Sequence, residues 1–154
     1  MKPLRNPEIL TFDLIIPDME ATTGVQKVLG FSRGWHHWNS VRLGIRKEND
    51  YCVLYLYAYV RGELVVKRID RLINVGATVK VCIEFNNTGM SIDTGVGTLD
   101  LDYFVYYKFS QKIHPCKLGY LLYPYFETDG DNPVKKPFKV EISNVRVNGK
   151  IINI

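Results

Sequence analysis

Tyr51-Cys-Val-Leu-Tyr-Leu-Tyr-Ala-Tyr-Val60 is an uninterrupted run in which tyrosine occupies nearly every second position. Successive side chains of a β-strand point to opposite faces of the sheet, so the run predicts one strand with two different faces. The face expected to lie in the core holds Cys52, Leu54, Leu56, Ala58 and Val60. The opposite face holds Tyr51, Val53, Tyr55, Tyr57 and Tyr59.

Similar alternation recurs along most of the chain and predicts about ten short strands. Besides the tyrosine run, the expected strands cover residues 9–16, 25–32, 40–47, 64–72, 79–85, 90–93, 99–109, 118–126, 138–142 and 151–154. Arg61-Gly62-Glu63 predicts a hairpin turn, and Pro124 places strand 118–126 at a sheet edge or a bulge. No segment has a sustained helical period, and residues 19–28 hold one helical turn at most. The pattern predicts an all-β fold, an antiparallel two-sheet β-sandwich over residues 25–154, preceded by an extended N-terminal segment over residues 1–24.

Length and charge limit the classes of partner. A chain of 154 residues is long enough to bury one hydrophobic core without support from disulfides or metal ions. The net charge of +4 is spread along the sequence, whereas a nucleic-acid binder concentrates its positive charge in one stripe. We therefore expect no nucleic-acid partner.

Cysteine usage and the N-terminus predict the compartment. The three cysteines, Cys52, Cys82 and Cys116, are an odd number and form no C-x-x-C motif, so a reducing compartment is expected. Cys52 and Cys82 are interpreted as small buried hydrophobic residues. The N-terminal apolar residues are broken by charge, which is not typical of a signal peptide, and no window is long enough to span a membrane. The expected location is the cytoplasm or a virion assembled inside a cell.

The tyrosine face is the first candidate binding surface. Tyr55, Tyr57 and Tyr59 lie on one side of the predicted strand, and exposed aromatic rings can stack on the apolar faces of sugars. The alternative is that these rings pack beneath loops or against a partner subunit.

A second candidate is the segment Arg33-Gly-Trp-His-His-Trp-Asn39, which gathers side chains typical of recognition. Within it, Trp35, His36, Trp38 and Asn39 are candidates for contact with a ligand or partner, and local packing of the loop is the alternative. His36 and His37 would point to opposite sides of an extended chain, which disfavours a shared metal.

Two acidic clusters are weaker candidates. Asp129, Asp131 and Asn132 could supply oxygen ligands to Ca²⁺, but the run lacks the spacing of a calcium loop and also fits a polar turn. Asp100 and Asp102 share a face of a predicted strand, as two carboxylates of a glycoside hydrolase could, yet solvent-facing residues explain the pair without chemistry. No cofactor motif is present, and we expect no cofactor and no enzyme activity.

The distribution of strands resembles the concanavalin-like jelly-roll sandwiches of lectins, carbohydrate-binding modules and some glycanases. The likeness rests on Trp38-Asn-Ser-Val-Arg-Leu-Gly-Ile45 leading into the tyrosine strand and on Gly119-Tyr-Leu-Leu-Tyr-Pro-Tyr-Phe126 near the C-terminus. The resemblance implies sugar binding at Tyr55, Tyr57, Trp35, Trp38 and Tyr125. The E-x-D-x-x-E catalytic strand of laminarinase-type glycanases is absent, so no catalytic role carries over.

Two hypotheses follow for a non-enzymatic recognition module. The first is a protein subunit of a larger assembly, such as a capsid-decorating, tail or fibre-associated subunit of a bacteriophage virion, because similar compact sandwiches are used there. The second is a carbohydrate-binding, lectin-like module with a glycan partner. A homo-oligomer is compatible with both hypotheses, and a glycoside hydrolase is a distant third.

Overall fold

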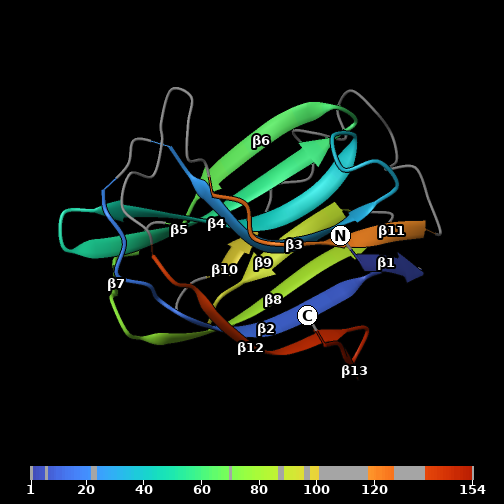
Figure 1. Ribbon diagram of the computed structural model, residues 1–154. Coiled ribbons are helices and arrows are strands. Elements are labelled where there is room, and N and C mark those ends of the chain that lie inside the picture. The colour runs from blue at the N-terminus through green and yellow to red at the C-terminus, as the bar shows by residue number, and fades with distance from the viewer. Residues whose placement is uncertain are drawn as a thin grey trace.

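The computed structural model describes residues 2–5, 7–21, 24–69, 71–86, 89–95, 98–100, 118–126 and 138–153. These residues form two antiparallel sheets packed as two layers (Figure 1). The seven-stranded sheet has the order β1-β11-β3-β4-β5-β6, with β7 paired to β5, and the six-stranded sheet has the order β10-β9-β8-β2-β12-β13. The described part of the chain has no helix long and apolar enough to cross a membrane.

The strands of the seven-stranded sheet are β1 (Lys2–Arg5), β3 (Gln26–Arg33), β4 (Asn39–Glu48), β5 (Tyr51–Val60), β6 (Glu63–Arg68), β7 (Ile73–Asn74) and β11 (Leu118–Leu122). The strands of the six-stranded sheet are β2 (Ile9–Ile15), β8 (Thr78–Asn86), β9 (Gly89–Asp93), β10 (Thr98–Asp100), β12 (Glu141–Val147) and β13 (Lys150–Ile151).

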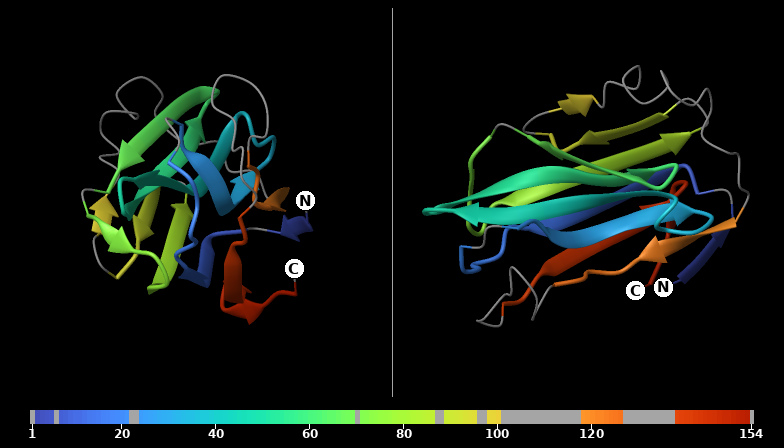
Figure 2. Two further views of the ribbon diagram at one scale, coloured as in Figure 1. Left: turned by 60° about the vertical axis from the view of Figure 1, so that its left-hand side comes forward. Right: turned by 90° about the horizontal axis from the view of Figure 1, so that it is seen from above.

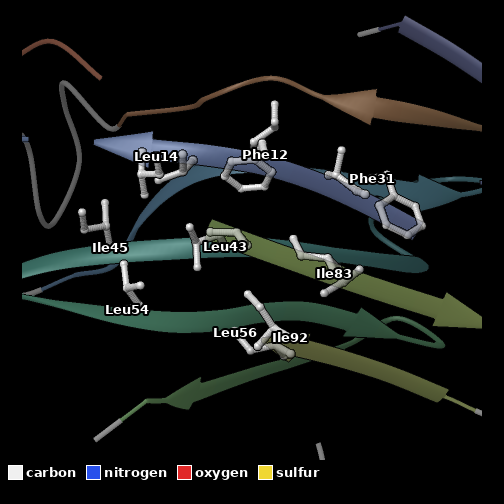
Figure 3. Close-up of a cluster of buried hydrophobic side chains, with 14 of the residues drawn as sticks. Phe12, Leu14, Phe31, Leu43, Ile45, Leu54, Leu56, Ile83 and Ile92 are labelled. Carbon is white, nitrogen blue, oxygen red and sulfur yellow. The ribbon is translucent and has the colours of Figure 1, made fainter. Parts of the chain in front are cut away.

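One hydrophobic core lies between the sheets. Figure 3 shows side chains from β2, β3, β4, β5, β8 and β9 meeting there, among them Phe12, Phe31, Leu56 and Ile83. The predicted core face of the tyrosine strand is confirmed, since Cys52, Leu54, Leu56, Ala58 and Val60 are all buried in this core. Burial of this much apolar surface is the main favourable term in folding.

Several strand predictions are confirmed closely. Those over residues 9–16, 40–47, 51–60, 79–85 and 90–93 match β2, β4, β5, β8 and β9 to within a residue or two. The hairpin between β5 and β6 is also confirmed. Arg61 and Gly62 both have positive φ, 50° and 82°, as the two central residues of a type I′ turn require.

The described residues within 1–24 differ from the expected extended segment. They contain β1 and β2, and β2 pairs with both β8 and β12 inside the six-stranded sheet. Leu10, Phe12 and Leu14 on β2 are buried in the core. The sandwich therefore includes strands from both sides of the expected boundary at residue 24.

Strand 118–126 also differs from the prediction. β11 ends at Leu122, before Pro124, and lies inside the sheet between β1 and β3 rather than at an edge. Beyond the proline, Tyr125 forms an isolated bridge with Lys27 on β3. Of predicted strand 99–109, only residues 99 and 100 lie in the described part of the chain, within β10.

The ends of the described chain lie at sheet edges. β1 is the outer strand of one sheet and β13 the outer strand of the other, and both ends lie on the same side of the molecule (Figure 2). The Asn148 side-chain oxygen accepts hydrogen bonds from the backbone N–H groups of Glu8 and Ile9, at 2.9 and 3.0 Å. This contact ties the start of β2 to the turn between β12 and β13.

Candidate binding pocket on the seven-stranded sheet

The outer face of the seven-stranded sheet is ordered in rows that cross the strands. Ser40 on β4 pairs with Tyr59 on β5, and Arg42 on β4 pairs with Tyr57 on β5. Directly paired residues share a face of the sheet. Because the opposite face is buried against the second sheet, Arg42, Tyr57 and Tyr59 all point away from the core.

A pocket of about 300 Å³ opens on this face. Its lining consists of Lys27, His36, His37, Ser40, Arg42, Tyr57, Tyr59 and Tyr125. The volume lies at the lower end of the range typical of small-ligand sites.

The turn between β3 and β4 brings both histidines to the pocket. Gly34 has a φ of 79°, and the backbone N–H of Trp38 donates to the Trp35 carbonyl at 2.9 Å, which closes the turn. In this compact turn the rings of His36 and His37 have centroids 4.0 Å apart. The extended geometry that would separate the two rings is therefore not present.

The aromatic rings of the pocket contact one another at their edges. The ring centroids of His37 and Tyr59 are 5.5 Å apart and those of Tyr57 and Tyr59 are 6.2 Å apart, each pair nearly perpendicular. Edge-to-face contacts of this kind add to the stabilisation from burial. These contacts orient the rings of His37, Tyr57 and Tyr59 relative to one another beside the hollow.

Lysine and arginine complete the lining. The Lys27 Nζ lies 4.9 Å from the centroid of the Tyr57 ring and 5.4 Å from that of the Tyr125 ring, within the range of cation–π attraction. The Arg42 Nη2 donates to the Tyr123 carbonyl at 3.4 Å. Both cations are thus held at the pocket by neighbours from separate segments of the chain.

Burial and charge shift three titrating groups in the pocket. Burial, then His37 and Arg42, lowers the pKa of His36. Burial also lowers the pKa of Arg42, against the opposing effect of Tyr57 and Tyr59. The pKa of Tyr59 is raised by burial and by neighbouring Tyr57. The histidine and arginine shifts both indicate an environment that disfavours additional positive charge.

Four of the predicted binding residues line the pocket together: His36, Tyr57, Tyr59 and Tyr125. Trp35 is 65% exposed and does not line the pocket, but its ring centroid lies 5.2 Å from that of His37, which does. Trp38 is half exposed and packs against Gly62 in the β5–β6 turn.

The other two predicted residues have structural contacts instead. The Asn39 side chain is buried, and its oxygen accepts a hydrogen bond from the backbone N–H of Arg61 at 3.2 Å. Tyr55 is buried with the Arg46 guanidinium 5.6 Å from its ring centroid. Neither side chain lines the pocket. The calcium candidates Asp129, Asp131 and Asn132 lie outside the described residues, as does Asp102.

Sequence reasoning omitted Lys27, His37, Ser40 and Arg42 from the binding residues. The sequence pattern could have identified Ser40 and Arg42, because they alternate with the apolar Val41 and Leu43 directly after the Trp-His segment. No such pattern identifies Lys27. It faces outward because the register of β3 and β4 shifts between Lys27 and Gly30, and such a bulge is not visible in alternation.

A second hollow, of about 520 Å³, lies on the outer face of the six-stranded sheet and has mixed charge. Its Asp13 accepts a hydrogen bond from the Asn144 side chain, and its Asp93 accepts one from the backbone of Gly95, each at 2.8 Å. Burial raises the pKa of the Cys82 thiol there, and nearby carboxylates raise it further. The thiol therefore stays protonated and is a poor nucleophile.

Metal-ligating groups are sparse on both faces. Within the described ranges, no three histidine, cysteine, aspartate or glutamate side chains are close enough together to hold a metal ion. The pocket lined by Tyr57, Tyr59 and Tyr125, called the tyrosine pocket below, is the candidate binding site because it gathers several aromatic rings and polar groups on one sheet face.

Comparison with known proteins shows the fold. The chain is similar to a heptameric SAP-like pentraxin from Limulus polyphemus, with a TM-score of 0.54 at 13% sequence identity, over 99% of this chain and 69% of the pentraxin chain. It is also similar to chicken galectin 2, with a TM-score of 0.46 at 16% identity, over 92% of this chain and 98% of the galectin. No family model and no curated protein matches the sequence. The likeness to the pentraxin, together with the two antiparallel sheets, confirms the concanavalin-like jelly-roll β-sandwich predicted from the sequence.

Proposed function

We propose that this protein binds carbohydrate in the tyrosine pocket and does not catalyse a reaction on it. The observation that carries the proposal is the composition of the pocket, in which three tyrosines and two histidines surround a hollow on an open sheet face. Sugar sites pair an aromatic surface with a few fixed polar groups, since a sugar ring has both apolar faces and hydroxyls.

Two exposed rings suit the stacking role. Tyr125 is 58% exposed and lines the pocket, and Trp35 is 65% exposed beside His37. Tyr57 and Tyr59 are half buried, so their hydroxyls are better placed than their ring faces to contact a ligand. We assign Tyr125 the stacking role and Tyr57 and Tyr59 the role of hydrogen bonding to sugar hydroxyls.

A glycan array followed by calorimetric titration of the best ligand tests this function. Tyr125→Ala should weaken binding by about tenfold or more, as expected when an aromatic stacking contact is lost. Tyr123→Ala is the matched control, because Tyr123 is half exposed on the same segment and does not line the pocket. A blank array, or equal losses in the two variants, would contradict the proposal.

The absence of catalysis is tested in the same samples. New reducing ends should not form when the array ligands are incubated with the protein. Their appearance, with loss in an Asp100→Asn variant, would favour the glycoside hydrolase alternative.

A second candidate function is a subunit of a larger protein assembly, such as a phage virion. It is favoured by β6, an edge strand of the described sheet on which Leu64 and Val66 are 46% and 43% exposed. They lie beside Tyr59 and Tyr57 in the strand register. An edge strand with exposed apolar side chains is a template for pairing with another chain.

Size-exclusion chromatography with light scattering distinguishes this candidate. An assembly subunit should form oligomers that Leu64→Lys with Val66→Lys disrupts, because charge on an edge strand opposes pairing. A strict monomer that captures no partner subunit would count against it. The expected location, the cytoplasm or a virion, is tested by whether purified virions contain the protein. Its presence there would favour the virion.

A further inference from the structure

β6 is an edge strand within the described part of the seven-stranded sheet (Figure 1). Its neighbour is β5, and the two strands are joined by the two-residue turn of Arg61 and Gly62. In such a hairpin the two residues that flank the turn exchange both backbone hydrogen bonds, and so does every second pair along the strands. The backbone groups of Leu64 and Val66 therefore point away from β5, in the plane of the sheet.

The side chains of β6 place apolar residues at the centre of the strand and a charge on either side of them. Leu64 and Val66 lie on the outer face and are exposed, whereas Val65 is buried on the core face. Glu63 and Lys67 share the face of Val65 and are exposed and half-buried. The strand thus carries an acidic residue before its apolar centre and a basic residue after it.

A second copy of the chain can extend the sheet at β6 in certain registers. Directly paired residues of antiparallel strands share a face, and both members of a hydrogen-bonded pair have backbone groups that point at the other strand. A two-fold axis at Val65 satisfies both conditions. It pairs Leu64 of each copy with Val66 of the other, and each such pair exchanges two backbone hydrogen bonds and brings two apolar side chains together.

The same register places opposite charges together. Glu63 of each copy lies opposite Lys67 of the other, and the symmetry forms this pair twice. Shifting the axis by one residue in either direction leaves Lys67 opposite Arg61 or Val65 instead. Lysine on an edge strand ordinarily opposes pairing, whereas opposite charges that face each other across two strands stabilise it. The edge of β6 is therefore complementary to itself in the register centred on Val65.

We propose that the chain forms a two-fold homodimer in which β6 pairs antiparallel with β6 of a second copy. This dimer is one form of the assembly candidate above, on which it rests, and it does not depend on carbohydrate binding. The axis is perpendicular to the sheet, so the two tyrosine pockets open on the same side of the dimer. The contact closes on itself and does not propagate into a fibre. The pairing covers residues 63–67 of each chain, and a small interface of this kind dissociates at roughly micromolar concentrations.

Sedimentation equilibrium over a series of protein concentrations tests the dimer. Glu63→Lys and Lys67→Glu should each weaken dimerisation by about tenfold, because each replaces two attractive pairs with two repulsive ones. An equimolar mixture of the two variants should regain the affinity of the unmodified protein, because a lysine then lies opposite a glutamate at both positions. Lys150→Glu makes the same charge change on β13 of the other sheet and should leave dimerisation unchanged. Circular dichroism confirms that each variant is folded.

The outcomes separate this dimer from the other proposals. A chain that stays monomeric at every concentration would overturn the dimer, and glycan binding by that monomer would keep the proposed function. Capture of a different protein by a monomeric chain would also overturn the dimer while keeping the assembly candidate. Dimers that neither charge variant weakens, that Lys150→Glu weakens equally, or that the mixture fails to restore would overturn the β6 register. A blank glycan array with dimers that respond as expected would overturn carbohydrate binding alone.

Discussion

Gly30 sets how closely Arg42 lies against the sheet. The two residues are paired between β3 and β4. A Cβ at Gly30 would lie 2.1 Å from the Val41 carbonyl oxygen and 2.6 Å from the Arg42 Cγ, far inside ordinary contact. Glycine is therefore required here for space, so that the stem of Arg42 can cross the neighbouring strand.

Gly30→Ala should destabilise the protein by about 1–3 kcal/mol, the usual cost of overpacking. It should also weaken glycan binding in the tyrosine pocket, because Arg42 must shift. Urea unfolding and calorimetry measure the two effects. Ser143→Ala, at an exposed position on β12, is the control and should stay within about 0.5 kcal/mol. An unchanged urea midpoint for Gly30→Ala would contradict the close approach.

Stability should fall in acid through His36. Its pKa is lower in the folded protein than the ordinary value of 6.5, so the unfolded chain binds more protons in that range. The contribution of His36 is complete above pH 6.5 and is lost as pH falls through the folded-state pKa. Urea midpoints measured from pH 8 to pH 5 should show this loss, and His36→Gln should reduce it. A midpoint that rises as the solution is acidified, with the rise removed in His36→Gln, would contradict the sign.

At the scale of elements, β2 joins the N-terminal residues to the core. Phe12 is 1% exposed and lies between the two sheets (Figure 3). Phe12→Ala should cost about 3–5 kcal/mol, since it leaves a cavity. Thr11→Ala, on the opposite face of the same strand, should cost far less. Deletion of residues 1–24 should leave the remainder unfolded by circular dichroism, and a folded fragment 25–154 would restore the boundary expected from the sequence.

Strands were predictable from the sequence where the two faces of the sheet carry different kinds of side chain. Alternation identified β4 and β5 closely, because one face of each packs in the apolar core and the other carries tyrosine, arginine and serine. The same signal failed to give strand partners, which depend on contacts between residues far apart in the chain. Nothing in residues 9–16 indicates pairing with β8 and β12, so β2 looked like part of a peripheral segment.

The binding residues were predictable only in part, for a similar reason. Tyr57, Tyr59 and His36 are conspicuous in the sequence, and their clustering follows from the β4–β5 hairpin and the adjoining turn. Lys27 and Tyr125 are brought together by an isolated bridge. Contacts across such sequence distances, like the bulge that turns Lys27 outward, leave no local pattern.

At the scale of the whole molecule, both sheets contribute to one core, so unfolding should be cooperative. Trp35 and Trp38 lie at the β3–β4 turn, and their fluorescence reports the pocket end of one sheet, whereas far-ultraviolet circular dichroism reports all strands. The two signals should change at the same urea concentration, as in a two-state transition. Earlier loss of the fluorescence signal would instead indicate that the pocket end opens separately.

The edge positions of β1 and β13 have a mechanical consequence. Tension applied at residues 2 and 153 would act first on these two outermost strands and would unzip their hydrogen bonds one after another. The strands that carry the pocket, β3, β4 and β5, lie inside their sheet and would bear the load last. When the protein is pulled at both ends, β1 and β13 would therefore detach first, and the pocket on β3, β4 and β5 would still hold its ligand.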